Sequence, residues 1–207
     1  MENTNFLAGY GTNAMLKIIS PDGHASDLGV NLEIIQETCP IFAMEFEPTG
    51  PLGELRFTVD ASSPAVVICF LRFIYLGKYV LDDTDPEPRH LLLHTELYQR
   101  ADIYDLPELQ VEAYQNLAQD LELSCCYPQP PADLCETIRF VYQHLHTHQG
   151  LIDNILHYVV ECFRYHNLSQ NESFKQLFAE NHQFSRDLSR MNMQRGFEDA
   201  GKLTSLQ

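Results

Sequence analysis

Residues 62–77 read SSPAVVICFLRFIYLG. The Ser-Ser-Pro start offers a hydroxyl N-cap with proline in the first helical turn, and Gly77 can supply the left-handed residue that ends a helix. Between these ends only Arg72 is charged, so the predicted helix has almost no polar face to present to solvent. We therefore expect this helix at the centre of the core.

The residues before this helix predict a small sheet and two short helices. Residues 54–60 (ELRFTVD) alternate apolar and polar side chains with a period of two, as a half-buried strand does. Strand patterns and then helical spacing come earlier, over 15–19, 24–30, 32–39 and 41–46. The prolines and glycines of 48–53 mark a loop.

The residues after it predict further helices. Helical patterns cover about 89–103, a segment from 105 onward, 133–148, 151–166 and 171–191. In the segment from 105 onward one face is lined at intervals of four residues by Leu109, Ala113, Leu117 and Leu121. The predicted fold class is therefore α+β, a helical cluster with a small sheet followed by an all-helical extension. The predicted domains are an N-terminal tail over 1–13, a domain over 14–124, a proline-rich linker over 125–132, the helical extension over 133–192 and a C-terminal tail over 193–207.

The chain is strongly acidic. Its 207 residues include 13 Lys and Arg against 29 Asp and Glu, which gives a net charge of −16. Residues 1–124 hold 20 of the acidic residues but only 6 of the basic ones. Nucleic-acid backbones need clustered Lys and Arg, so we expect no nucleic-acid partner. A hydrophobic content of 44% is that of a chain that folds into a globule.

Neither a membrane span nor an export signal is evident. No apolar stretch approaches the ~20 residues of a transmembrane helix. Residues 1–6 (MENTNF) lack the positive and apolar regions of a secretory signal. We therefore expect an intracellular protein, cytoplasmic, nuclear or both, with no membrane partner. Its six cysteines are expected to be reduced.

Three stretches, in a fixed order, resemble the BTB/POZ domain. The first is ETCPIF at 37–42, which matches the Ser-Pro-x-Phe signal at the end of the family's first helix, with cysteine in place of serine. The second joins the alternating strand of 55–60 to a helix that closes in FIYLG at 73–77. The third and most specific is ADIYDLPEL at 101–109, similar to the family's Ala-Asp-x-Tyr-x-Leu-Pro-x-Leu signal. The resemblance covers about 14–124, and the helical extension looks most like that of fungal BTB proteins.

The resemblance implies a protein-protein interaction module, either an adaptor or an oligomerisation domain. Many BTB domains bind the cullin scaffold of a ubiquitin ligase through a hydrophobic-x-Glu element. The positions that match this element are Leu52 and Glu54, with Met44 and Phe46 nearby as apolar anchors. The implied partners are a cullin or a second copy of the chain. The alternative is a homodimeric scaffold or transcription-associated regulator that binds no cullin.

The N-terminal segment departs from the family. Residues 1–13 are too short for the extra helix that long-form members exchange in their dimer. The family's Asp before the first strand is not evident, and Asn31 stands where its first helix usually begins with His. Residues 9–14 (GYGTNA) fit a relaxed phosphate-binding pattern, but that pattern needs a strand before it and a helix after it. We therefore expect a flexible tail.

Two further residue patterns could support catalysis. Cys39 could be a nucleophile, but its place before Pro40 on an apolar helix favours a buried structural thiol. His144 and His148 could face one metal ion if a single helix holds both, which is the remote alternative of a metal-dependent enzyme. Gly150 indicates that the helix ends there, so a solvated helix end is favoured. We expect no enzymatic activity.

Two other clusters of residues partly resemble metal sites. The spacing of Cys125, Cys126 and Cys135 fits no zinc knuckle. The acidic run over 82–87 is interrupted by proline, whereas a calcium loop needs ligands at defined alternate positions. A solvated loop is the favoured interpretation. We therefore expect neither a cofactor nor a bound metal.

Overall fold

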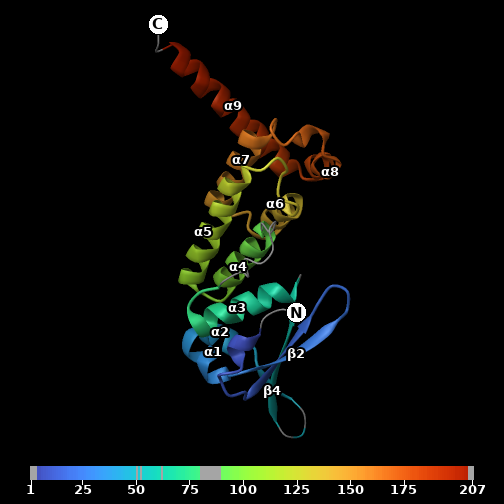
Figure 1. Ribbon diagram of the computed structural model, residues 1–207, viewed down its shortest axis with the longest axis vertical. Helices are drawn as coiled ribbons and strands as arrows, with labels where there is room; N and C mark the ends of the chain where they lie inside the picture. The colour runs from blue at the N-terminus through green and yellow to red at the C-terminus, as the bar shows by residue number, and fades with distance from the viewer. Residues whose placement is uncertain (1–3, 50, 52, 62, 80–89, 205–207) are drawn as a thin grey trace. The chain divides into compact units, whose positions relative to one another are not determined.

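The computed structural model describes residues 4–49, 51, 53–61, 63–79 and 90–204 (Figure 1). The chain divides into two units, Met1–Pro86 with Glu96–Ala113, and Glu87–Thr95 with Tyr114–Gln207. The first unit holds one four-stranded sheet together with helices. Every regular element of the second unit in the described ranges is helical. The predicted α+β class, with a helical extension after it, is thereby confirmed.

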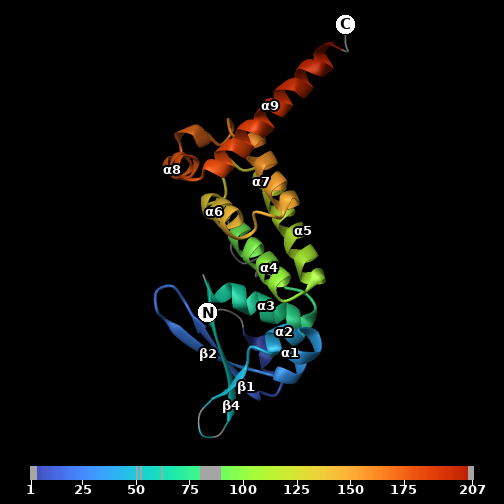
Figure 2. The same cartoon turned by 180° about the vertical axis from the view of Figure 1, so that it is seen from behind.

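Four short strands form the sheet. They are β1 (Ala14–Ile19), β2 (Ala25–Val30), β3 (Glu47–Thr49) and β4 (Glu54–Asp60), in the order β2-β1-β4-β3 (Figure 2). β1 pairs antiparallel with β2 and parallel with β4, and β3 adds an antiparallel edge to β4. A parallel pair needs a crossover connection, which contains helices α1 (Leu32–Thr38) and α2 (Pro40–Ala43).

Strand β3 (Glu47–Thr49) corrects the start of the loop predicted over 48–53, whereas residues 51 and 53 lie in a turn as predicted. Its three residues include Pro48, which lacks a backbone N–H. An edge strand tolerates proline because one of its sides makes no ladder hydrogen bonds. Pairing with β4 therefore makes a strand where the local sequence predicts a turn.

Helix α3 (Pro64–Leu76) is the buried helix that the sequence predicts. Ser63 Oγ accepts a hydrogen bond from the Ala65 N–H at 3.2 Å. Gly77 ends the helix with a φ of 72° and donates its N–H to the Phe73 carbonyl. Eight of its thirteen side chains are buried, so the helix is enclosed on nearly all sides. Both predicted caps and the core position are confirmed.

The N-terminal segment is packed, which corrects the expectation of a flexible tail for residues 4–10. A 3-10 turn over Asn5–Leu7 buries Leu7. The rings of Phe6 and Tyr10 meet the ring of Tyr75 at centroid distances of 5.9 and 5.1 Å, close to edge-on. Such contacts join residues far apart in the sequence, so no local pattern predicts them.

Helices α4 (Leu91–Ile103) and α5 (Pro107–Ser124) contribute residues to both units. The face predicted for α5 at intervals of four residues is buried throughout, and it consists of Leu109, Ala113, Leu117 and Leu121. That part of the sequence prediction is confirmed. The predicted linker over 125–132 follows α5 and lies within the second unit.

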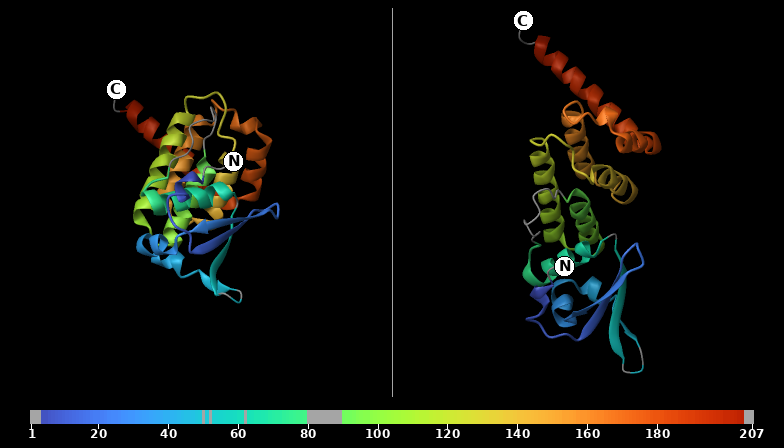
Figure 3. Two further views of the ribbon diagram at one scale, coloured as in Figure 1. Left: turned by 60° about the horizontal axis from the view of Figure 1, so that its bottom comes forward. Right: turned by 45° about the vertical axis from the view of Figure 1, so that its right-hand side comes forward.

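The second unit continues with α6 (Leu134–His144), α7 (Gln149–Cys162), a 3-10 turn at Leu168–Gln170, α8 (Glu172–Glu180) and α9 (His182–Thr204) (Figure 3). The single helix predicted over 171–191 is therefore two helices. Asn181 separates them, because its side chain accepts the Phe184 N–H at 3.0 Å and so caps α9. α9 continues to Thr204, through the segment predicted as a tail.

Candidate functional site

The residues expected to bind a partner lie in different surroundings. Met44, directly after α2, is 79% exposed, whereas Phe46 is only 7% exposed. Glu54 begins β4, and its carboxylate accepts two hydrogen bonds from the Arg56 guanidinium, the shorter at 2.7 Å. Leu52 lies outside the described residues. Met44 and Glu54 therefore offer surface to a partner, and Phe46 does not.

A cluster of aromatic rings explains the burial of Phe46. The Phe42 ring of α2 meets the rings of Phe46, Phe57, Phe70 and Tyr104, with centroids 5.1–5.7 Å apart and planes close to perpendicular. Edge-to-face pairs of this kind add to the stabilisation from burial alone. The cluster joins α2 to β4, α3 and the turn after α4, so it fixes the position of the residues that flank α2.

The thiol of Cys39 belongs to the same core. Its Sγ donates to the Tyr104 carbonyl at 3.8 Å, and none of its surface is exposed. Burial raises the pKa of Cys39, which disfavours the nucleophilic thiolate. The burial predicted for this cysteine is confirmed, and its environment is that of a packing residue.

Three apolar side chains remain exposed around this cluster. Ile41 is 41%, Met44 is 79% and Ile103 is 57% exposed. Ile41 and Ile103 are the sequence neighbours of Phe42 and Tyr104, whose rings are 5.1 Å apart. Ile41 and Met44, three residues apart, share a face of α2. Ile103 ends α4 directly before Tyr104, whose ring packs on Phe42 of α2. We call Ile41, Met44 and Ile103 the α2 patch.

Acidic side chains border the α2 patch. Glu45 follows Met44 and is exposed. The pKa of Tyr104 is raised mainly by burial and in part by the nearby charge of Glu45, which places this carboxylate close to the cluster. Glu47, two residues further along on β3, is also exposed. Apolar side chains beside carboxylates can bind a protein segment, because burial supplies affinity and charge sets orientation.

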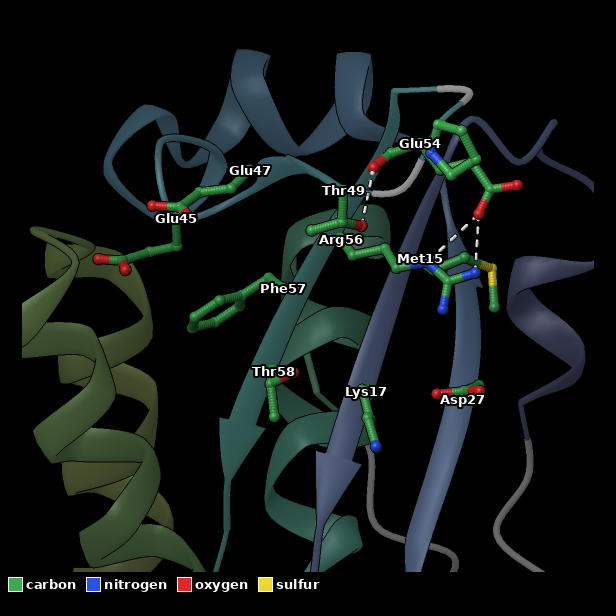
Figure 4. Close-up of a pocket in the computed structure, with 11 residues that line it drawn as sticks. Met15, Lys17, Asp27, Glu45, Glu47, Thr49, Glu54, Arg56, Phe57 and Thr58 are labelled. Carbon is green, nitrogen blue, oxygen red and sulfur yellow. Dashed lines mark hydrogen bonds and ion pairs between the residues drawn. The ribbon is translucent and has the colours of Figure 1, made fainter.

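A concavity of about 780 Å³ continues from these acids over the outer face of the sheet (Figure 4). Lys17 on β1 is paired in register with Asp27 on β2, and Arg56 on β4 with Glu47 on β3. Glu54 forms the ion pair with Arg56 described above. These side chains are exposed and of mixed sign, as on the solvated face of a sheet whose other face packs on the core. The concavity therefore suits polar contacts at the edge of a protein interface.

The two histidines expected to face one metal ion do not lie on one helix. His144 is the last residue of α6, with its ring centroid 4.7 Å from that of Phe140, and His148 precedes the first residue of α7. Gly150 lies in the first turn of α7, so the predicted helix end there is wrong, because the break comes at His144. In the part of the chain that the structure describes, no group of three or more His, Cys, Asp or Glu could hold a metal ion. The acidic run over 82–87 lies outside the described residues.

Sequence reasoning missed the buried polar contacts of the second unit. Asp133 precedes α6, but its Oδ2 accepts the Leu92 N–H at 2.9 Å and so caps α4. Asp120 accepts the neighbouring His90 N–H at 3.2 Å. Burial raises the pKa of Asp133, and the hydrogen bond from Leu92 opposes that shift. Aspartate is a preferred cap, but a cap supplied from a distant segment leaves no signal beyond the residue type.

Comparison with known proteins assigns no family to the chain. No family model matches it, and no curated protein does either. None of the helices in the described ranges is long and apolar enough to cross a membrane. Function is therefore inferred from the fold and its surface.

Proposed function

We propose that the chain is a non-catalytic protein-interaction module of the BTB/POZ type, an adaptor or oligomerisation domain that binds a partner through the α2 patch. The observation that carries the proposal is the 79% exposure of Met44 beside the buried Phe42 cluster. Covering apolar surface is favourable by roughly 25 cal/mol per Å². Phe42 and Phe46, on either side of Met44, are fixed by their ring contact, so little backbone freedom is lost when a partner covers the Met44 side chain.

The chemistry of the patch favours a partner segment with both apolar and basic side chains. Methionine is unbranched and adapts to apolar surfaces of varied shape. Ile41 and Ile103 extend the apolar area around it. Glu45 and Glu47 attract Lys or Arg, and the acidic excess of residues 1–124 repels acidic partners.

The order of the elements supports the BTB type. β1, β2, α1, α2, β4, α3, α4 and α5 follow one another in the order that the resemblance implies. The stretch ADIYDLPEL at 101–109 joins α4 to α5, and it buries Ala101, Tyr104, Leu106 and Leu109. The N-terminal region of a cullin is the first candidate partner. A cytoplasmic or nuclear site of action belongs to the same proposal.

The test combines a binding assay with a measurement of mass. The 207-residue chain is passed over an immobilised cullin N-terminal domain, and its mass in solution is measured by light scattering. Met44→Glu places a charge in the α2 patch. Leu76→Glu is the matched control, because Leu76 is an apolar side chain of similar kind, 49% exposed at the C-terminal end of α3, that does not belong to the α2 patch.

The outcomes separate the two forms of the proposal. Cullin binding that Met44→Glu abolishes and Leu76→Glu preserves supports the adaptor. A stable dimer that does not bind the cullin, and that Met44→Glu dissociates, supports the homodimeric scaffold or regulator. The same result rules out the cullin as the partner. A monomer that does not bind the cullin, or binding that survives Met44→Glu, overturns the proposed use of this surface.

A further inference from the structure

Two cysteine sulfurs meet in the second unit. Cys125 directly follows α5, and Cys162 is the last residue of α7. Their Sγ atoms are 3.3 Å apart, although the residues are 37 positions apart in the sequence. Cys162 is buried at 4% exposure, whereas Cys125 is partly exposed. All six cysteines of the chain are free thiols in this structure.

A buried histidine, His166, joins the residues after α5 to the end of α7. His166 Nε2 lies 2.9 Å from the Tyr127 carbonyl and donates to it, because a carbonyl can only accept. In the neutral imidazole, Nδ1 then accepts from the Tyr158 hydroxyl, 3.0 Å away. The backbone N–H of His166 also donates to the Cys162 carbonyl at 2.8 Å. The residues after α5 are thus fastened to the end of α7.

Local contacts fix the Cys125 side further. Its N–H donates to the Glu122 carbonyl at 3.1 Å, and its Sγ donates to the Leu121 carbonyl at 3.5 Å. Both sulfurs are therefore held on ordered backbone. A disulfide bond is ~2.05 Å long, so the sulfurs need to approach by only about 1.3 Å, within reach of a small side-chain rotation.

We propose that Cys125 and Cys162 form a reversible disulfide when the chain is oxidised by a peroxide. The Cys125 thiolate attacks one oxygen of hydrogen peroxide, the O–O bond breaks, and the released hydroxide takes up a proton to become water. The Cys162 sulfur then attacks the Cys125 sulfenic acid, the S–O bond breaks, and the hydroxide leaves as water with the Cys162 proton. In total, two thiols and one peroxide give one disulfide and two waters.

The surroundings assign the order of these steps. Burial and the neighbouring Cys125 thiol raise the pKa of Cys162 to about 12, so Cys162 stays protonated at neutral pH. The first attack therefore falls to Cys125, which is also the more exposed of the two. Cys162 acts as the resolving thiol, already in contact with the sulfur that it must attack.

The disulfide ties the end of α5 to the end of α7 and closes a loop of 37 positions that contains α6 and α7. A cross-link that closes a loop of this length reduces the freedom of the unfolded chain. The oxidised chain is therefore expected to melt several degrees higher than the reduced chain. This inference concerns the second unit alone and does not depend on the α2 patch.

The test is peptide mapping of the oxidised protein. The 207-residue chain is treated with hydrogen peroxide, digested with trypsin without reduction, and compared with a sample reduced by dithiothreitol. Cleavage after Arg100, Arg139 and Arg164 puts Cys125 on the peptide 101–139 and Cys162 on the peptide 140–164. We expect these two peptides to be joined, to lack two hydrogen atoms, and to separate on reduction.

Substitutions identify the sulfurs and provide the controls. Cys125→Ser and Cys162→Ser are each expected to abolish the link and the rise in Tm. Cys126→Ser and Cys135→Ser should preserve both the link and the rise in Tm. They are needed as controls because Cys126 and Cys135 lie on the same tryptic peptide as Cys125, so the peptide mass alone does not identify the linked sulfur. The proposal is overturned if no link forms in the wild type, if the link uses Cys126 or Cys135, or if non-reducing electrophoresis shows that it joins two chains.

Discussion

The carboxylate of Asp133, at the start of α6, accepts a hydrogen bond from the backbone N–H of Leu92, 2.9 Å away at the start of α4. The two residues are 41 positions apart in the sequence. The first N–H groups of a helix have no partner within the helix, so this contact satisfies one of them. A single acid thus fastens the segment before α6 to α4 within the second unit.

Loss of this cap should weaken the fold by a measurable amount. Removing a capping side chain typically costs about 1 kcal/mol. Asp133→Ala is therefore expected to lower the free energy of unfolding by about 1 kcal/mol in urea at neutral pH. Gln143→Ala, at an exposed position of α6, should stay within about 0.5 kcal/mol of the wild type and serves as the control. Equal effects of the two substitutions would contradict the role of Asp133.

The same carboxyl should leave a signature in the pH dependence of stability. Burial raises the pKa of Asp133 above its ordinary value of 3.8. The folded chain therefore holds this proton at pH values where the unfolded chain has released it. Stability from this group is present at low pH and is lost as the pH rises through the raised pKa.

Asp133→Asn isolates this effect, because the amide keeps the shape and an acceptor oxygen but does not titrate. We expect the wild type to gain stability relative to Asp133→Asn as the pH is lowered from about 6 towards 4. Urea unfolding at several pH values measures the difference between the two proteins. A difference that is constant, or that shrinks as the pH falls, would show that the raised pKa is wrong.

Phe42 should be the most sensitive position of the first unit. Its ring is 1% exposed and contacts four other aromatic rings. Truncation of a buried phenylalanine costs about 3–5 kcal/mol, because packing is lost and a cavity remains. We expect Phe42→Ala to reduce the free energy of unfolding by that amount, or to leave the unit unfolded. Ile41→Ala, one residue away but 41% exposed, should change it by less than about 1 kcal/mol.

The histidines at the α6–α7 junction should bind no stoichiometric metal. His144 ends α6 and His148 precedes α7, so no single helix presents them to one ion. We expect elemental analysis of the purified chain to show no stoichiometric zinc, iron or manganese. Bound metal that is lost in both His144→Ala and His148→Ala would contradict this expectation and support the alternative hypothesis of a metal-dependent enzyme.

Local signals in the sequence predict the centre of the fold well. The hydroxyl cap at Ser63 and the glycine at 77 delimit α3, and the period-two pattern delimits β4 at Glu54–Asp60. Each of these signals comes from neighbours within one or two turns or one strand. β3 is not predicted because its pairing with β4 makes it a strand, whereas the local sequence, with Pro48, indicates a loop. The packing of Leu7 depends in the same way on distant residues.

The candidate surface was only partly predictable for the same reason. Met44 and Phe46 look alike as apolar residues after α2 in the sequence. Phe46 is buried because it meets Phe42 and Phe57, whose rings come from α2 and β4. Met44 has no place in that cluster and stays exposed. The contact between Cys125 and Cys162 likewise depends on how α5 and α7 pack, which no spacing rule predicts.

The parallel pairing of β1 with β4 affects how the chain can be made. Ala14 pairs with Leu55, which is 41 residues later in the sequence. During translation β1 and β2 therefore leave the ribosome well before β4, the strand that pairs with the other edge of β1. Leu16 and Ile18, which are 0% and 2% exposed in the finished fold, can be covered only after β4 and α3 have emerged. The nascent hairpin therefore presents an open strand edge and an apolar face during translation, which is the kind of surface that chaperones bind and from which aggregation begins.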